Sequence, residues 1–164
     1  LRNEKPACAL ERVRLNLTDV SARRTVFDEL GRRAKRVLVV SEGLIVYLSA
    51  DEVGALAEDL ARPPSFQRWA LDLASPGLLK MLQRSVGAQL DAAGAPLKFA
   101  PADGPDFFSS HGWRAVEVRS MFKTAARLRR LPLLLHLMSF LPESNGPQGS
   151  RPWSGGCLLQ KAGS

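Results

Sequence analysis

The spacing of apolar residues changes along the chain between a period of two and a period near 3.6, the periods of strands and helices. The predicted strands are residues 12–17, 36–40, 66–73, 114–119 and 156–161. The predicted helices are residues 18–33, 49–62, 77–93 and 123–141, with a short helical segment at 107–112 and a break at Pro132. Strands and helices therefore alternate, which predicts an α/β sandwich with a mostly parallel sheet.

The ends of the predicted helices carry residues that favour a start or a stop. Ser49 stands three residues before Glu52, the spacing of a capping box. Thr18 and Asp19 offer a cap for the first helix. Pro63 ends the second helix and Gly94 the third. These signals support the helix positions that the apolar spacing predicts.

Length and composition indicate one domain over residues 1–164, with 45% hydrophobic residues, which is enough for a core. No window reaches the roughly 18 apolar residues of a membrane span, and residues 131–141 come closest. We therefore expect no membrane segment. The first residues lack the apolar centre of a secretion signal, so Cys8 and Cys157 are expected to be reduced thiols in the cytoplasm.

The charge distribution and the missing motifs argue against several classes of function. The net charge of +7 is dispersed along the chain without interleaved aromatic residues, which does not favour nucleic-acid binding. Cys and His residues do not occur at zinc-ligand spacing, so no metal site is predicted. Dinucleotide, phosphate-loop, nucleophile-elbow and zinc-protease motifs are also missing from the sequence. Neither His111 nor His136 has a pattern that favours catalysis, and the catalytic residues stay unknown.

Polar residues follow the apolar runs at three predicted strand ends, residues 16–19, 41–43 and 72–75. In open α/β sheets, ligands bind at the carboxyl ends of the strands. At the second of these ends, Gly43 would let a ligand approach the backbone beside Glu42. Glu42 could bind an ammonium or a hydroxyl group, or it could cap a following helical turn. The pattern alone leaves these two interpretations open.

Two blocks of the sequence, ERVRLNLTD and RVLVVSEGLIVYLSADEV, resemble the leucine carboxyl methyltransferase-like family of S-adenosylmethionine-dependent methyltransferases. The more specific block is E-G-L-x-x-Y-L, which contains Glu42 and Tyr47 and precedes a helix that opens with an acidic pair. The resemblance extends through LDLASPGLL and FAPADGPDFFSSHGWRAVEVRS to GCLLQK, and so covers essentially the whole chain.

The resemblance implies the Rossmann-like class I methyltransferase fold, a three-layer sandwich with strand order 3-2-1-4-5-7-6 and an antiparallel seventh strand. The five predicted strands would be strands 3 to 7 of that sheet, in chain order. Strands 1 and 2 would be missing, together with the glycine-rich turn after strand 1. We therefore expect a partial methyltransferase domain.

Site residues are implied by the same resemblance. Asn16 and Leu17 would hold the adenine of S-adenosyl-L-methionine, and Asp19 matches a second acidic position of that block. The family usually has Asp where this chain has Asn16, so charge assistance to the amine would be lost. Glu42, beside Gly43, would pair with the ammonium at the methionine end of the cofactor.

The implied activity is O-methyl transfer to an unidentified acceptor, either a small molecule or a carboxylate-bearing partner. In this family, acceptor contacts come largely from insertions, here residues 78–105 and 122–152. The alternative is a truncated, non-catalytic remnant that acts as an interaction module. Without strands 1 and 2, one sheet edge would lie open, which could permit self-association.

Overall fold

The computed structural model describes residues 7–132, 147–148 and 151–163 and shows an α/β fold. Its helices are α1 (Val20–Arg33), α2 (Ala50–Ala61), α3 (Pro76–Ala92) and α4 (Met121–Arg127). Two 3-10 helices are η1 (Ile45–Tyr47) and η2 (Gly104–His111). The strands are β1 (Val37–Ser41), β2 (Phe66–Ala74), β3 (Trp113–Ser120) and β4 (Ser154–Lys161).

The four strands form one sheet in the order β1-β2-β4-β3. β1 and β2 are parallel, whereas β4 runs antiparallel to both of its neighbours, β2 and β3. This arrangement confirms the 4-5-7-6 order, with its antiparallel seventh strand, that the resemblance predicted. The sheet therefore has the order and directions expected for strands 4 to 7 of the class I methyltransferase fold.

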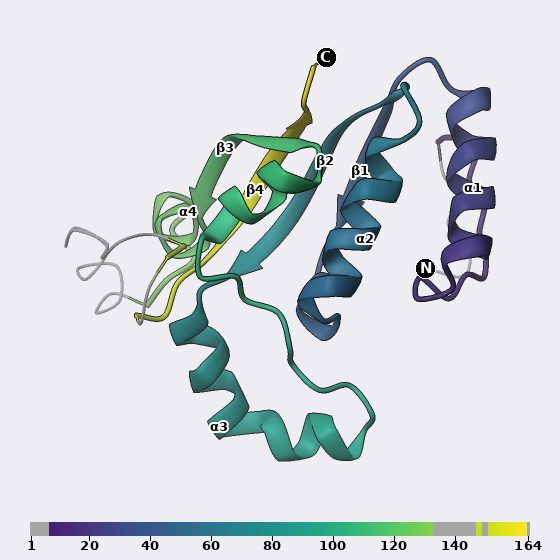
Figure 1. Cartoon of the computed structure of the whole chain (residues 1–164). Helices are drawn as coiled ribbons and strands as arrows, with labels where there is room; N and C mark the ends of the chain where they lie inside the picture. The colour runs from purple at the N-terminus through teal and green to yellow at the C-terminus, as the bar shows by residue number, and fades with distance from the viewer. Residues whose placement is uncertain (1–6, 133–146, 149–150, 164) are drawn as a thin grey trace.

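Helices lie on both faces of the sheet (Figure 1). α2 and η2 lie in front of the strands in this view, and η2 packs against both β3 and α2. The paler α4 lies behind and contacts β3 and β4. α1 stands beyond β1, and α3 lies below the carboxyl ends of β1 and β2.

Aromatic side chains form the centre of the core between the sheet, α2 and η2. Trp69, Trp113 and Phe108 are fully buried. The ring centroid of Trp69 lies 5.3 Å from that of Phe108 and 5.7 Å from that of Trp113, both in edge-to-face geometry. Each indole N–H has a partner, because Trp69 donates to Ser41 Oγ at 2.9 Å and Trp113 to the carbonyl of Ala57 at 2.9 Å. Burial of these rings therefore leaves no donor unsatisfied.

The helix caps predicted from the sequence are confirmed. Ser49 Oγ accepts from the N–H of Glu52 at 3.2 Å, and Glu52 Oε2 accepts from the N–H of Ser49 at 2.7 Å. The backbone N–H of Ser49 is the main cause that lowers the pKa of Glu52. Asp19 Oδ1 caps α1 by accepting from the N–H of Ala22 at 3.0 Å, and Gly94 takes a left-handed φ of 70° just past α3.

The prediction of a strand at residues 12–17 was wrong, because the structure has no regular element there. The segment has the alternation of a strand, but a strand needs a neighbour to take its backbone hydrogen bonds. In the predicted strand order that neighbour is strand 2, which has no counterpart among the described residues. Leu17 nevertheless packs its side chain against the core.

The last predicted helix is shorter than expected where the structure describes it. α4 ends at Arg127, and Arg129 has a positive φ of 54°, which a helix does not accommodate. Residues 133–141 of that prediction lie outside the described residues. Over the part of the chain that the structure describes, none of the helices has the length and apolar character needed to cross a membrane.

Candidate functional site

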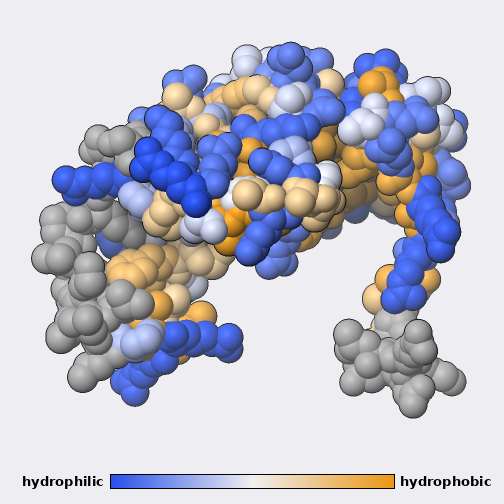
Figure 2. All heavy atoms as spheres, turned by 90° about the horizontal axis from the view of Figure 1, so that it is seen from below, coloured by the Kyte–Doolittle hydropathy of each residue, from blue (hydrophilic) through white to orange (hydrophobic). Residues whose placement is uncertain are grey.

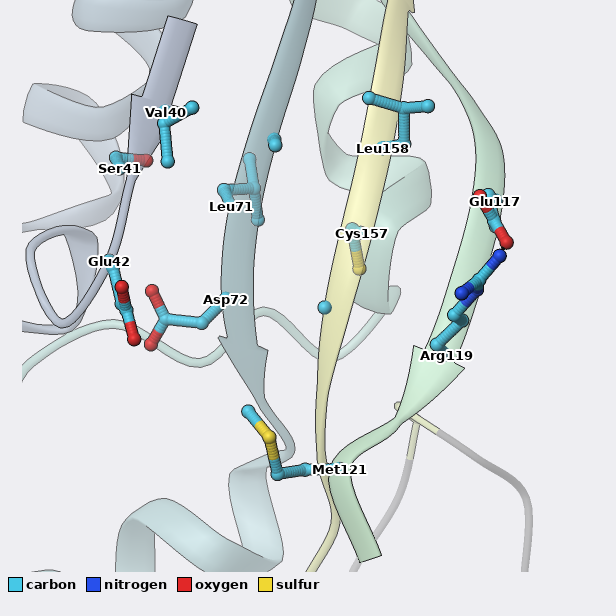
Figure 3. Close-up of a pocket in the computed structure, with 12 residues that line it drawn as sticks. Val40, Ser41, Glu42, Leu71, Asp72, Glu117, Arg119, Met121, Cys157 and Leu158 are labelled. Carbon is cyan, nitrogen blue, oxygen red and sulfur yellow. Dashed lines mark hydrogen bonds and ion pairs between the residues drawn. The ribbon is translucent and has the colours of Figure 1, made fainter. Parts of the chain in front are cut away.

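A cleft of about 400 Å³ opens along the sheet at the carboxyl ends of β1 and β2 (Figure 3). Every strand contributes to its lining. The polar or reactive side chains in it are Ser41 at the end of β1, Glu42 just after it, Asp72 of β2, Glu117 and Arg119 of β3, and Cys157 of β4. Figure 2 views the molecule from below, and on that face apolar side chains are exposed between hydrophilic ones.

The turn after β1 is fixed by a contact with β2. Gly43 has a φ of 58°, and its N–H donates to Asp72 Oδ1 at 2.8 Å. A Cβ atom at Gly43 would meet nothing within 4 Å, so the backbone conformation, and not space, requires glycine here. The turn therefore directs Glu42 into the cleft beside Asp72 (Figure 3).

The structure tests one of the two interpretations of Glu42, that it caps a following helical turn. η1 begins after Leu44, and no side chain caps its first turn. The helix-cap interpretation is therefore wrong. The carboxylate of Glu42 is exposed, and among the described residues it has no hydrogen-bond or ion-pair partner. The carboxylate of Glu42 is thus held in the cleft by the turn, and its oxygens are available to bind a ligand.

The electrostatics of the cleft favour a cation near β1 and β2. Glu42 and Asp72 point toward one another (Figure 3), and the only cation in the described lining, Arg119, is paired with Glu117. Two carboxylates at close range attract a positive group and repel an anion. The donor set therefore fits an ammonium or sulfonium group at this end of the cleft.

Cys157 lies in the cleft lining but does not supply a nucleophile. Its side chain is buried, and burial together with the charge of Asp72 raises the pKa of the thiol to about 11. The reactive thiolate is therefore scarce at neutral pH. The cleft offers binding groups and no activated nucleophile of its own among the described residues.

Three of the predicted site residues lie apart from Glu42 and Gly43. Asn16, Leu17 and Asp19 precede or cap α1 and do not line the cleft. Asn16 Oδ1 accepts from the N–H of Thr18 at 3.1 Å and from Thr18 Oγ1 at 2.9 Å. The carboxylate of Asp19 caps α1. Of the predicted site residues, Glu42 therefore lies in the cleft, whereas the three residues predicted for the adenine end lie outside its lining.

The sequence pattern placed Asp72 at a strand end but did not identify it as a site residue. Its contact with Gly43 depends on the register of β1 against β2, in which Ser41 pairs with Leu71. A signal was nevertheless present, since Asp72 interrupts the apolar residues Leu71 and Leu73 of a strand. Leu71 and Leu73 are buried, and the alternation turns Asp72 to the opposite face.

Comparison with known proteins finds likeness only among solved structures, and the likeness is distant. No family model matches the chain, and no curated protein does. A search of solved structures finds magnesium protoporphyrin IX methyltransferase (ChlM) from Synechocystis PCC 6803 with bound SAH, at 12% identity and a TM-score of 0.44. The match covers 81% of this chain and 48% of that one, so the chain spans about half the length of that protein. At this TM-score, the likeness bears on neither the family nor the activity of the chain.

Proposed function

We propose that the chain is part of an S-adenosylmethionine-dependent methyltransferase of the leucine carboxyl methyltransferase-like family and supplies the C-terminal half of its domain. The observation that carries this proposal is the acidic turn at Glu42 and Gly43, held by Asp72 at the carboxyl end of β1. The strand order β1-β2-β4-β3 supports it, because it is the order that the family resemblance predicts for strands 4 to 7. The free Cys8 and Cys157 agree with the proposed cytoplasmic location.

In the proposed site, Glu42 accepts hydrogen bonds from the ammonium of the cofactor, and Gly43 keeps the backbone open beside it. Asn16 and Leu17 serve the adenine end, and Asp19 holds their loop by capping α1. An amine that binds Asn16 Oδ1 competes there with the N–H and hydroxyl of Thr18. S-adenosyl-L-methionine supplies an activated methyl group, and the residues of the chain contribute alignment and exclusion of water. The acceptor atom is an oxygen, of a carboxyl or a hydroxyl group.

The test is calorimetric titration with S-adenosylhomocysteine. We expect binding by a longer polypeptide that includes a glycine-rich strand-turn-helix upstream of residue 1, and little or none by the 164 residues alone. In the longer polypeptide, Glu42→Gln is expected to weaken binding roughly tenfold or more, since a charge-assisted hydrogen bond contributes about 1.5–3 kcal/mol.

The matched control is Glu29→Gln, which removes one carboxylate from an exposed position on α1 and should leave the affinity unchanged. Absence of binding by the longer polypeptide would contradict the proposed function. Micromolar binding by the 164 residues alone would instead show that the site is complete without the upstream part.

A second candidate, an interaction module without catalysis, is favoured by the sheet edge. β1 has no partner strand on its outer side among the described residues, and Leu38 and Val40 are 58% and 66% exposed. Large apolar side chains at an unpaired edge attract another chain.

A further inference from the structure

A second cleft, of about 380 Å³, lies below the sheet between α3, η1 and the segment that follows α3. Its apolar wall on α3 is a stripe of four side chains spaced four residues apart, Leu78, Leu82, Val86 and Leu90. Leu78, Leu82 and Leu90 are partly buried and Val86 is exposed, although the spacing is that of a core-facing stripe. Leu97 and Phe99 face this stripe from the opposite wall. The described residues thus leave an apolar surface of α3 open toward the cleft.

The walls of this cleft are fixed by hydrogen bonds. The carbonyl of Val46 in η1 accepts from the N–H groups of Lys98 at 2.7 Å and Phe99 at 3.1 Å. Gln83 Nε2 on α3 donates to the carbonyl of Leu97 at 2.9 Å, which joins the two walls. Ser75 is fully buried and caps the first turn of α3. The opening is therefore part of the folded arrangement, with both walls held at their backbones.

The described lining of the cleft has few polar side chains, those of Tyr47, Asp72 and Ser154. Asp72 is the only charged residue in its described lining, and the one phenol there is Tyr47, at 36% exposure. Asp72 and Met121 also line the cleft at the end of β1, so the two cavities meet at these side chains (Figure 3). Asp72 Oδ1 accepts from Gly43, and Oδ2 has no protein partner among the described residues.

We propose that this cleft binds the methyl acceptor, and that the acceptor is an uncharged apolar molecule whose hydroxyl group faces Asp72. This inference rests on the proposed function, which left the acceptor oxygen as that of a carboxyl or a hydroxyl group, and it selects the hydroxyl group. Apolar walls fit an apolar body, and a carboxylate accepts a hydrogen bond from a hydroxyl. A carboxylate acceptor would bring a second negative charge against Asp72 and Glu42, with no cation in the described lining of this cleft to offset it.

In the proposed arrangement, the methyl group passes from the cofactor to the acceptor oxygen and the hydroxyl proton passes to Asp72. The acceptor oxygen forms a bond to the methyl carbon as the bond from that carbon to the sulfonium sulfur breaks, which leaves a neutral thioether. The hydroxyl proton passes to the carboxylate of Asp72, so that the product is a neutral methyl ether. Asp72 would touch the reacting hydroxyl, and the α3 stripe would hold the body of the acceptor.

The test uses the 164-residue chain without cofactor and two probes of the same shape, 1-naphthol and 1-naphthoate, titrated by fluorescence. We expect 1-naphthol to bind at least tenfold more tightly than 1-naphthoate. Leu82→Asp should weaken 1-naphthol at least tenfold, and Leu82→Trp should do the same by filling the cleft while keeping an apolar side chain. The matched control is Met81→Asp on the same helix, because Met81 does not line this cleft, and it should change the affinity less than twofold.

A second variant tests the role of charge. Asp72→Asn keeps an oxygen for the N–H of Gly43 and should bring the affinities for the two probes within about threefold of each other. Failure of 1-naphthol to bind, equal binding to the Leu82 variants, or equal binding of 1-naphthoate to the unmodified chain would each overturn the inference. Because no cofactor is present, these outcomes test the cleft as a binding site by itself. Failure of the S-adenosylhomocysteine titration would instead overturn the proposed function, and with it the role of the bound molecule as methyl acceptor, even if 1-naphthol binds in the cleft.

Discussion

Asp59 is a buried carboxylate whose charge is matched by two arginines from α1. Arg23 donates to its Oδ2 through Nε at 2.8 Å, and Arg24 donates to its Oδ1 through Nε at 2.6 Å. Asp59 and Arg23 are each 2% exposed. Burial of the carboxyl raises its pKa, but hydrogen bonds and charges from Arg24 and Arg23 outweigh this effect, so the pKa of Asp59 lies below its ordinary value. The ion pair therefore joins α1 to α2 in a water-poor environment.

Asp59→Asn is expected to lower the free energy of unfolding by about 3 kcal/mol, because it leaves Arg23 buried without its counter-charge. Asp28→Asn, at an exposed position of α1, is the control and should stay within about 0.5 kcal/mol. Urea denaturation at pH 7 measures both variants. A loss as small as that of the control would show that the pair contributes nothing to stability.

The same carboxyl predicts how stability depends on pH. A lowered pKa in the folded state means that the unfolded chain binds the proton more readily, so this contribution is present above about pH 4 and is lost as pH falls further. Urea midpoints measured from pH 7 to pH 3 should fall for the unmodified chain and fall less steeply for Asp59→Asn. Parallel curves for the two proteins would contradict this assignment.

Helix α2 and the 3-10 helix η2 pack closely at Gly54 of α2. A Cβ atom built at Gly54 would lie 2.7 Å from Cε1 of His111. The imidazole cannot move away freely, since its Nδ1 lies 3.0 Å from Glu58 Oε1 and its ring packs against Phe107. Gly54 is therefore in the middle of a helix because η2 approaches α2 there, in spite of the cost of glycine to helix formation.

Gly54→Ala should destabilise the fold by about 1–3 kcal/mol, because the overpacking against His111 exceeds the gain of about 1 kcal/mol in helix propensity. Gly87→Ala on α3 is the matched substitution, since the nearest atom to its Cβ would be 3.7 Å away, in Gln83. That variant should be neutral or gain about 0.5–1 kcal/mol. Chemical denaturation of both variants compares the signs, and stabilisation by Gly54→Ala would refute the close approach.

The elements that the sequence predicted well are those whose signals are local. The cap at Ser49 and the stop after α3 at Gly94 each depend on a few adjacent residues. Residues 12–17 and 37–41 show the limit, because both have strand composition but only the second has a neighbouring strand. The contact of Asp72 with Gly43 likewise depends on strand register, which the sequence does not display. The stripe on α3 was predictable, but its opening toward a cleft was not.

The open edge of the sheet at β1 is where the molecule could associate with another copy. β1 is the outermost strand at one edge of the sheet among the described residues, and α1 stands beyond it (Figure 1). As the second candidate function, we propose that an extended segment of another copy pairs with β1 and covers Leu38 and Val40.

Val40→Lys should then reduce self-association, because a lysine at an edge discourages strand pairing. Sedimentation velocity over a range of micromolar concentrations measures the effect. Leu10→Lys adds the same charge at an exposed position away from the sheet and should leave association unchanged. A monomeric unmodified chain at every concentration would remove this candidate.

Arg23 also connects the core to the segment before α1. Its Nη1 donates to the carbonyl of Leu17 at 2.6 Å, while its Nε is held by Asp59. The orientation of the peptide at Leu17 is therefore set by a residue of α2, 42 positions further along the chain. A loop that is held in this way before any ligand arrives loses little conformational entropy on binding. The affinity of the proposed adenine end would thus depend on helix packing as much as on the groups that touch the base.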